Sequence, residues 1–224
     1  SIGGSAFYNC ANLTNIRFGE ESQLTSIGSY AFYSCKNLTT INIPDSVTSI
    51  ENNAFYECTG LTGQLKLPAN LTTIGERAFI GCKNLSGELI IPDKVTSIGK
   101  GAFSGWTGLT TIKIPDGVTV MEAFSNCVNL TTVIFGEGSQ LTSIGSSAFN
   151  SCSSLTSIAI PNGVTSIGQN AFSGCSKLTS ITIPDSVTSI GSSAFGSCSS
   201  LTSIAIPNSV TSIGSYVFSH CTSL

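Results

Sequence analysis

The sequence is poor in charged residues, which make up 9% of its 224 positions, against roughly 25% in an average soluble protein. The formal net charge at pH 7 is −3, and the isoelectric point is about 5.0. So slight a negative charge offers no electrostatic attraction to nucleic acids or anionic membranes, and we expect neither as a partner. Hydrophobic residues reach 41%, which is enough to bury a sizeable core.

Long apolar runs are also missing. No stretch approaches the roughly 18 consecutive apolar residues of a membrane-spanning helix, so we expect no membrane insertion within this segment. The chain begins with Ser1-Ile2-Gly3-Gly4 instead of a basic and then apolar segment, so it lacks the pattern of a signal peptide. It also lacks an initiator methionine, and we expect it to be a segment of a longer protein.

Residues with catalytic or metal-binding potential are few. The one histidine, His220, has the neighbouring Cys221 but no accompanying aspartate, and adjacent side chains rarely face each other. The nine cysteines are odd in number and form no C-x-x-C pair, which argues against a disulfide framework and against zinc. No D-x-D-x-D-G calcium loop or phosphate-binding glycine pattern occurs. We therefore expect no enzyme, no cofactor and no metal.

What the chain does contain is a repeat with a basic period of 23 residues. Its unit is A-F-x-x-C-x-x-L-T-x-I-x-I-P-x-x-V-T-S-I-G, and Trp106 takes the cysteine position once. Two units are one residue longer because they read L-T-G-Q-L-K-L-P and L-S-G-E-L-I-I-P. We number the coils 1 to 10 by their phenylalanines, which are Phe7, Phe32, Phe55, Phe79, Phe103, Phe124, Phe149, Phe172, Phe195 and Phe218.

Each part of the unit predicts a local structure. L-T-x-I-x-I alternates apolar and polar residues and is rich in β-branched side chains, so we expect a strand that the proline ends. V-T-S-I predicts a second short extended piece, and the glycine permits the next turn. The three-residue apolar spacing in A-F-x-x-C-x-x-L predicts a short helical turn. One coil cannot close a core alone, but stacked coils can.

The cysteine column has a structural interpretation. Its positions are flanked by core positions and have almost no Lys, Arg or His nearby, whereas reactive thiols need exposed, electropositive surroundings. Trp106 supports this interpretation, because a core position can hold an indole and a metal or disulfide position cannot. We predict free, buried thiols without disulfides.

The unit resembles that of the BspA-like family of leucine-rich repeats, found in surface proteins of bacteria and some protists, and the resemblance covers the whole chain. It implies a curved leucine-rich-repeat solenoid, α/β or mainly β, with a parallel β-sheet on one face and short extended segments and helical turns on the other. Residues 1–224 would form one solenoid domain of about ten coils. The family also implies attachment to host proteins, cells or other microbes, and it supplies no shared catalytic residues.

The outward positions of L-T-x-I-x-I are the candidate binding face. In the first five coils these positions are varied and carry most of the charge, whereas in the last coils they are small and uniform. A specific partner would use the varied half, since charge and shape give selectivity. The candidate residues are Asn15, Arg17, Thr40, Asn42, Gln64, Lys66, Glu88, Ile90, Thr111 and Lys113.

Several functions remain open at this level. The leading hypothesis is a secreted or cell-surface recognition and adhesion module that binds an extracellular protein or glycan. The alternative is a structural rod of a surface coat or filament, which self-associates through its uncapped ends. Ice binding by the Thr and Ser rows is a weaker hypothesis, since V-T-S-I serves the coil itself. An enzyme is the least favoured of all.

Overall fold

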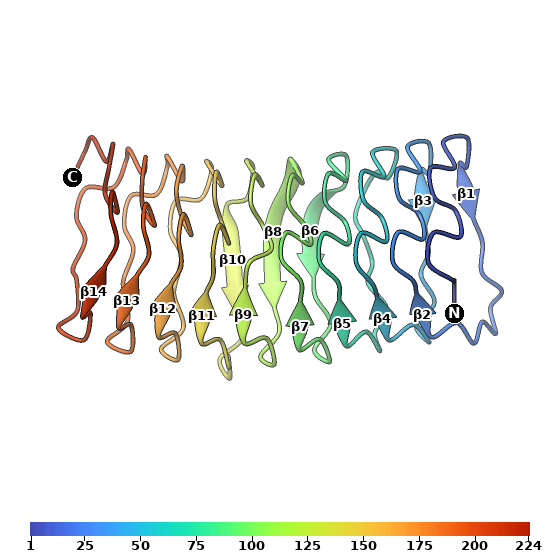
Figure 1. Cartoon of the computed structure of the whole chain (residues 1–224), viewed down its shortest axis with the longest axis horizontal. Coiled ribbons are helices and arrows are strands. Elements are labelled where there is room, and N and C mark those ends of the chain that lie inside the picture. The colour runs from blue at the N-terminus through green and yellow to red at the C-terminus, as the bar shows by residue number, and fades with distance from the viewer.

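The computed structural model describes residues 1–224. The chain winds into a rod of stacked coils, with the two termini at opposite ends (Figure 1). Each coil contributes one phenylalanine, and the ten rings make nine stacking contacts between consecutive coils. The rod therefore completes about nine full turns. It has no helix with the length and hydrophobicity needed to span a lipid bilayer.

The V-T-S-I segments form most of the strands. Adjacent coils pair them in parallel and in register, with Ser26 beside Ser49 and Ile27 beside Ile50. They make a four-stranded sheet, β2-β4-β5-β7, and a five-stranded sheet, β9-β11-β12-β13-β14. The strands are β2 (Ser26–Ile27), β4 (Ser49–Ile50), β5 (Thr73–Ile74), β7 (Ser97–Ile98), β9 (Val120–Met121), β11 (Ser143–Ile144), β12 (Ser166–Ile167), β13 (Ser189–Ile190) and β14 (Ser212–Ile213).

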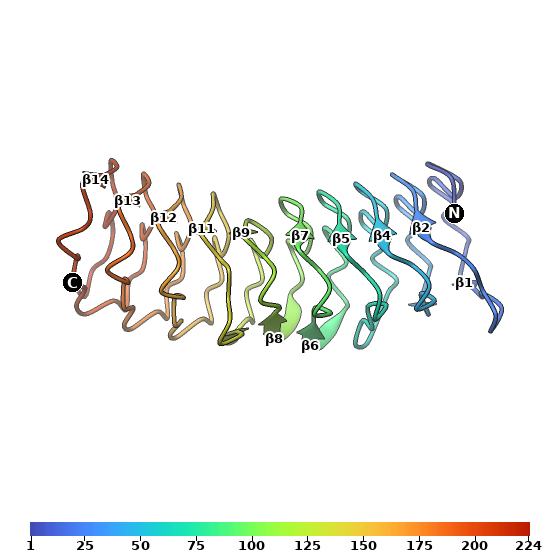
Figure 2. The same cartoon turned by 90° about the horizontal axis from the view of Figure 1, so that it is seen from below.

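The L-T-x-I-x-I segments pair less completely than the sequence predicts. They give a two-stranded sheet, β1-β3, and a three-stranded sheet, β6-β8-β10, both parallel. Their strands are β1 (Asn15–Ile16), β3 (Thr40–Ile41), β6 (Ser86–Ile90), β8 (Gly108–Ile114) and β10 (Thr132–Phe135). Figure 2 shows that the rod bends, with the V-T-S-I strands on the inner side and β6 and β8 on the outer side. The outer side spreads the coils apart, which explains its interrupted pairing.

The prediction of helical turns in A-F-x-x-C-x-x-L is wrong. The segment forms successive tight turns with i→i+3 bonds, as from the Cys35 N–H to the Phe32 carbonyl at 3.1 Å. Residues two before and two after each phenylalanine are left-handed, as at Tyr30 (φ 59°) and Ser34 (φ 54°), with the single exception of Glu122 before Phe124. A left-handed residue interrupts an α-helix. Instead of forming helical bonds, the Phe32 N–H donates to the Ala54 carbonyl of the next coil at 2.7 Å.

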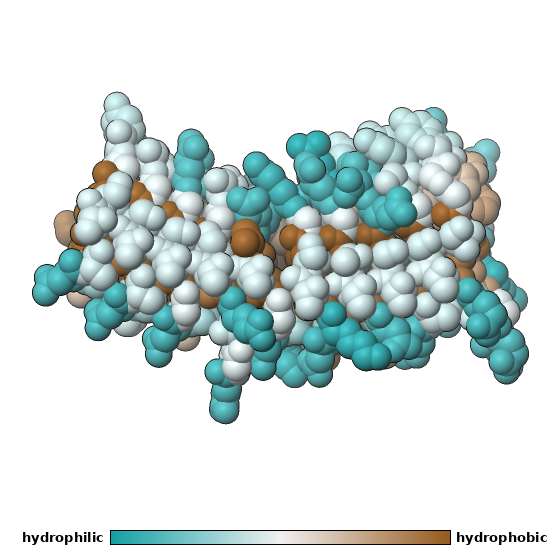
Figure 3. Space-filling view, turned by 60° about the horizontal axis from the view of Figure 1, so that its bottom comes forward, coloured by the Kyte–Doolittle hydropathy of each residue, from teal (hydrophilic) through white to brown (hydrophobic).

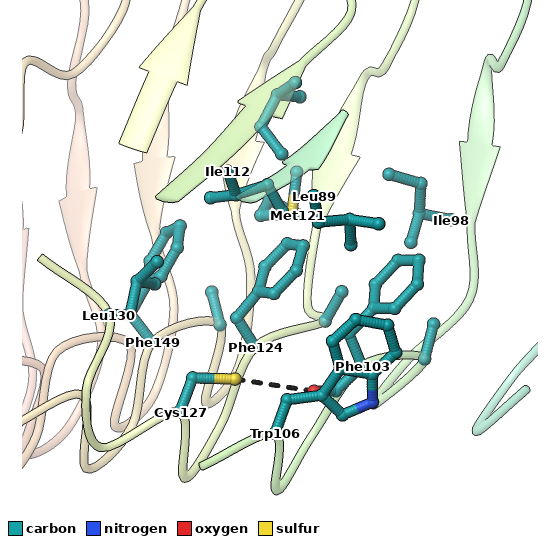
Figure 4. Close-up of a cluster of buried hydrophobic side chains, with 14 of the residues drawn as sticks. Leu89, Ile98, Phe103, Trp106, Ile112, Met121, Phe124, Cys127, Leu130 and Phe149 are labelled. Carbon is teal, nitrogen blue, oxygen red and sulfur yellow. Dashed lines mark hydrogen bonds between the residues drawn. The ribbon is translucent and has the colours of Figure 1, made fainter. Parts of the chain in front are cut away.

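One continuous core of 59 buried residues runs along the rod. Its axis is the phenylalanine ladder, whose rings stack with centroids 4.9 to 6.0 Å apart. Figure 4 shows Phe103, Phe124 and Phe149 in this ladder, together with Trp106 and Cys127. The thiol of each cysteine from Cys35 on donates to the phenylalanine carbonyl of the preceding coil, as from Cys127 Sγ to the Phe103 carbonyl at 3.4 Å.

Trp106 makes the same bond that the cysteines make. Its indole Nε1–H donates to the Phe79 carbonyl of the preceding coil at 2.8 Å, and the ring lies edge-on to Phe103 with centroids 5.3 Å apart. Cysteine and tryptophan share this position because both are apolar side chains that carry one hydrogen-bond donor. The column therefore packs the core and also ties each coil to the one before it.

Candidate functional site

Figure 2 shows β1, β6 and β8, which carry five of the ten predicted face residues, on the outer side of the bend. All ten residues are exposed except the half-buried Thr111. The sheet register pairs six of them. Asn15 pairs with Thr40, Glu88 with Thr111, and Ile90 with Lys113. These pairs lie in two separate sheets, β1-β3 and β6-β8-β10.

A groove on this surface lies over coils 3 to 5. It has a volume of about 650 Å³. Buried leucine and isoleucine side chains form its floor, and lysine side chains converge on it. Its lining residues are Gln64, Leu65, Lys66, Leu67, Ala69, Ile90, Ile91, Pro92, Asp93, Lys94 and Lys113. Four of the ten predicted residues line it, and an apolar hollow with a few convergent polar groups is the usual form of a binding site.

The extra residues in coils 3 and 4 shape this groove. Gly63 (φ 75°) and Gly87 (φ 87°) adopt the left-handed conformation, and no atom lies within 4 Å of where a side chain at either would begin. Glycine is therefore needed here for its backbone conformation rather than for lack of space. In coil 4 the register of β6 with β8 shifts between Gly87 and Glu88, where Thr110 of β8 has no partner in β6. In coil 3 only an isolated bridge, from Gly63 to Leu85, joins the segment to its neighbour.

The groove is locally positive although the chain as a whole is negative. Three of the nine lysine and arginine residues line it, against one carboxylate, Asp93. The only ion pair in the protein joins Arg77 to Glu76 at 3.6 Å, so Lys66, Lys94 and Lys113 have no carboxylate partner. Lys94 Nζ instead donates to the Asn70 side-chain oxygen at 2.6 Å. These ammonium groups can therefore pair with an acidic ligand.

Asp93 and Lys94 were not predicted as site residues. They lie in the P-x-x-V turn that follows the strand of coil 4, and the outward positions of the strand alone do not include them. The sequence does hold a signal for Lys94, because lysines occur in three consecutive coils. The turns of adjacent coils stack on one another as the strands do, so a lysine in a turn can lie near lysines of the neighbouring coils. Of the other six predicted residues, four line a smaller hollow of about 280 Å³, namely Asn15, Arg17, Thr40 and Asn42, whereas Glu88 and Thr111 line neither hollow.

The buried part of the cysteine column, from Cys35 to Cys198, offers no reactive site. All nine cysteines are free thiols, and seven are completely buried. Burial raises the pKa of Cys58 and of Cys127 to about 12, because the thiolate would lose its hydration. A thiol with a raised pKa is a poor nucleophile and a poor metal ligand at neutral pH. His220 is exposed, and its Nδ1 lies 2.8 Å from Ser219 Oγ.

Thiol labelling of the folded chain at neutral pH should therefore be selective. We expect rapid reaction only at the exposed Cys10, slower reaction at the half-buried Cys221, and protection of the other seven thiols. In denaturant all nine should react. Peptide mapping by mass spectrometry after timed alkylation gives both results. A total well below nine in denaturant, without reductant, would reveal disulfides and contradict the packing role.

The inner side of the bend differs from the groove face. Figure 3 shows pale rows of small polar side chains running along the rod beside a hydrophobic stripe. The threonines of V-T-S-I are exposed, but most of their hydroxyls donate to the preceding coil, as from Thr72 Oγ1 to the Thr48 carbonyl at 2.9 Å. A hollow of about 550 Å³ over β4, β5 and β7 has only Ile50 and Ile74 as apolar lining. We therefore place the candidate site on the outer side.

Comparison with known proteins identifies a leucine-rich repeat family. A model described as the BspA type leucine rich repeat region matches in six copies, over residues 1–122, 86–168 and 120–224. No curated protein matches the chain.

Among solved structures, a leucine rich cell surface protein from Faecalibacterium prausnitzii is 31% identical, with a TM-score of 0.55, over 100% of this chain and 75% of that one. The leucine rich repeat protein of T. pallidum is 27% identical, with a TM-score of 0.59, over 79% of this chain and 70% of that one. A leucine-rich repeat protein from Eubacterium ventriosum, 21% identical with a TM-score of 0.54 over 93% and 82%, shares the fold. The repeat unit, the stacked coils and the matched residues together show that this chain belongs to the BspA type leucine-rich repeat family.

Proposed function

We propose that the chain is a non-catalytic recognition and adhesion module of a secreted or cell-surface protein. It binds an extracellular protein or glycan through the outer face, and the groove over coils 3 to 5 is the centre of that contact. The observation that carries the proposal is this groove, where an apolar floor lies beside three lysines that have no carboxylate partner. The name of the F. prausnitzii relative, a cell surface protein, supports the location.

The chemistry of the remaining side chains supports a binding role. Seven of the nine thiols are buried, which raises their pKa, and the one histidine lies on an exposed turn beside a serine. A stacked solenoid presents a long rigid surface, so a partner can be recognised without ordering a loop. The polar, exposed residues around the groove provide a hydrated rim of the kind that surrounds most interface cores.

Charge reversal on the face tests this proposal. The variant R17E/K66E/K113E should lose binding to the proteins or glycans that the unchanged chain captures from arrays of extracellular-matrix proteins and glycans. The matched control K36E/K83E/K177E alters the net charge equally on exposed lysines elsewhere, and it should bind as the unchanged chain does. Equal binding by all three would rule out this face as the site.

Light scattering tests the alternative function, a self-associating rod. A molar mass that rises with protein concentration would favour that rod instead.

A further inference from the structure

We infer that the groove over coils 3 to 5 binds an extended polypeptide segment whose side chains alternate between acidic and apolar. This inference rests on the proposed function and gives the ligand a chemical class. It depends on three features of the groove: backbone groups without partners, an apolar floor, and unpaired lysines at the edge.

The backbone of residues 64–67 in coil 3 is the first feature. None of its N–H or C=O groups makes a backbone hydrogen bond, although Gly63 just before it still accepts from the Ser86 N–H at 2.8 Å. The Gln64 side chain partly bridges the gap, because its Nε2 donates to the Glu88 carbonyl at 2.9 Å. Residues 64–67 line the groove, so a bound ligand can supply the hydrogen-bond partners that these backbone groups lack.

The floor of the groove selects apolar side chains. Leu65 is 6% exposed, Leu67 5% and Ile91 1%, so their carbon atoms form a fixed base. Ile90 is 50% exposed and stands beside Lys113 in the register of β6 and β8. An exposed isoleucine at a groove edge exchanges contact with water for contact with an apolar ligand side chain, which favours binding.

The lysines select acidic side chains. Lys66, Lys94 and Lys113 come from three successive coils, so their ammonium groups follow the long axis of the rod. A strand places alternate side chains on opposite faces, so an extended ligand can direct apolar residues to the floor and acidic residues to the lysine edge. A positively charged ligand would be repelled by three ammonium groups that no carboxylate neutralises, and this repulsion adds selectivity for acidic ligands.

The groove suits a peptide better than a glycan. Sugar rings are commonly held against the flat faces of aromatic side chains, and no aromatic residue lines this groove. A row of tyrosines lies elsewhere: Tyr8, Tyr33 and Tyr56 stack ring on ring along the phenylalanine turns of coils 1 to 3.

The test is selection from a phage library of random dodecapeptides on the full chain, followed by affinity measurement with the synthesised winners. We expect enrichment of peptides that alternate Asp or Glu with apolar residues. Their Kd should rise at least about tenfold, or about 1.4 kcal/mol, in K66E/K94E/K113E and stay close to the original in K36E/K83E/K177E. Ile90→Thr should weaken binding, whereas Ile134→Thr should not, since Ile134 is similarly exposed but does not line the groove. Circular dichroism confirms that each variant is folded.

The outcomes separate this inference from the proposed function. Enrichment of neutral or basic peptides, no enrichment, or equal loss of affinity in the two lysine variants would overturn the ligand class. If array binding still depends on Arg17, Lys66 and Lys113 in that case, the face is a binding site for another ligand and the proposed function stands. If neither array binding nor peptide binding depends on the face lysines, the proposed function and the proposed ligand class are both contradicted.

Discussion

Replacing Phe124 by alanine is expected to lower the free energy of unfolding by about 3–5 kcal/mol, which is the usual cost of removing a buried phenylalanine ring. Phe124 is completely buried and stacks between Phe103 and Phe149, with centroids 5.3 and 6.0 Å away. Both neighbours belong to other coils, so the cavity weakens two coil interfaces at once. Because the stability of a solenoid depends on nearest-neighbour interfaces, the loss should divide the rod near its middle.

Urea unfolding followed by circular dichroism measures this effect. The matched control is Phe218→Ala, because Phe218 is half-buried and stacks on one ring only. The control should lower the stability clearly less. Equal losses in the two variants would mean that ring stacking does not connect the coils, and a loss below about 1 kcal/mol at Phe124 would contradict the buried ladder.

Alkaline pH should unfold the protein steeply. In the folded state the thiols of Cys58, Cys127 and Cys198 ionise only near pH 12, because burial raises their pKa. In the unfolded chain a thiol ionises near pH 8.5 to 9. Above that range the unfolded state has therefore lost protons that the folded state keeps, and the free energy of unfolding falls as the pH rises. Below about pH 8 these thiols should give no pH dependence.

The expected slope is large. Each buried thiol removes about 1.4 kcal/mol per pH unit once its unfolded form is ionised. Burial also raises the pKa of Cys82, Cys152 and Cys175 strongly, and it raises the pKa of the seventh buried thiol, Cys35, to a smaller extent, so Cys35 is left out of the sum. Six such thiols together remove about 8 kcal/mol per pH unit, against a typical total stability of about 5–15 kcal/mol. We therefore expect loss of the fold within about one or two pH units above pH 9.

Urea unfolding at stepped pH values, with reductant present, measures this slope. The double variant C58A/C198A keeps the other side chains unchanged and should flatten the slope by about a third, because it removes two of the six thiols. Ionisation of the exposed lysines and tyrosines is common to both proteins and cancels in the comparison. If the unchanged chain and the double variant have the same slope, the buried thiols do not set the alkaline limit.

Most of the fold follows from the repeat alone. The 23-residue period predicts stacked coils, the inward Leu and Ile positions and the buried cysteine column. The helical turns could not be predicted correctly, because a three-residue apolar spacing is common to a 3₁₀ turn and to successive tight turns. Only the left-handed residues that flank each phenylalanine, such as Tyr30 and Ser34, separate the two, and neither side chain signals that conformation in the sequence.

The site could be predicted as a face but not as a groove. Alternation along L-T-x-I-x-I is enough to place Gln64, Lys66, Ile90 and Lys113 on one surface. The hollow between them depends on the bend of the rod and on the conformation of the extra residues at Gly63 and Gly87. Lys94 joins the groove from a turn, so strand periodicity alone does not find it.

Hydrogen exchange of the chain with and without a selected acidic–apolar peptide tests the central claim most directly. In the free chain the amides of residues 64–67 have no backbone partners and should exchange rapidly. We predict that the peptide slows exchange at these amides and leaves that of the V-T-S-I strands unchanged. Slowed exchange along V-T-S-I, with none at residues 64–67, would place the binding site on the opposite side of the rod and contradict the account.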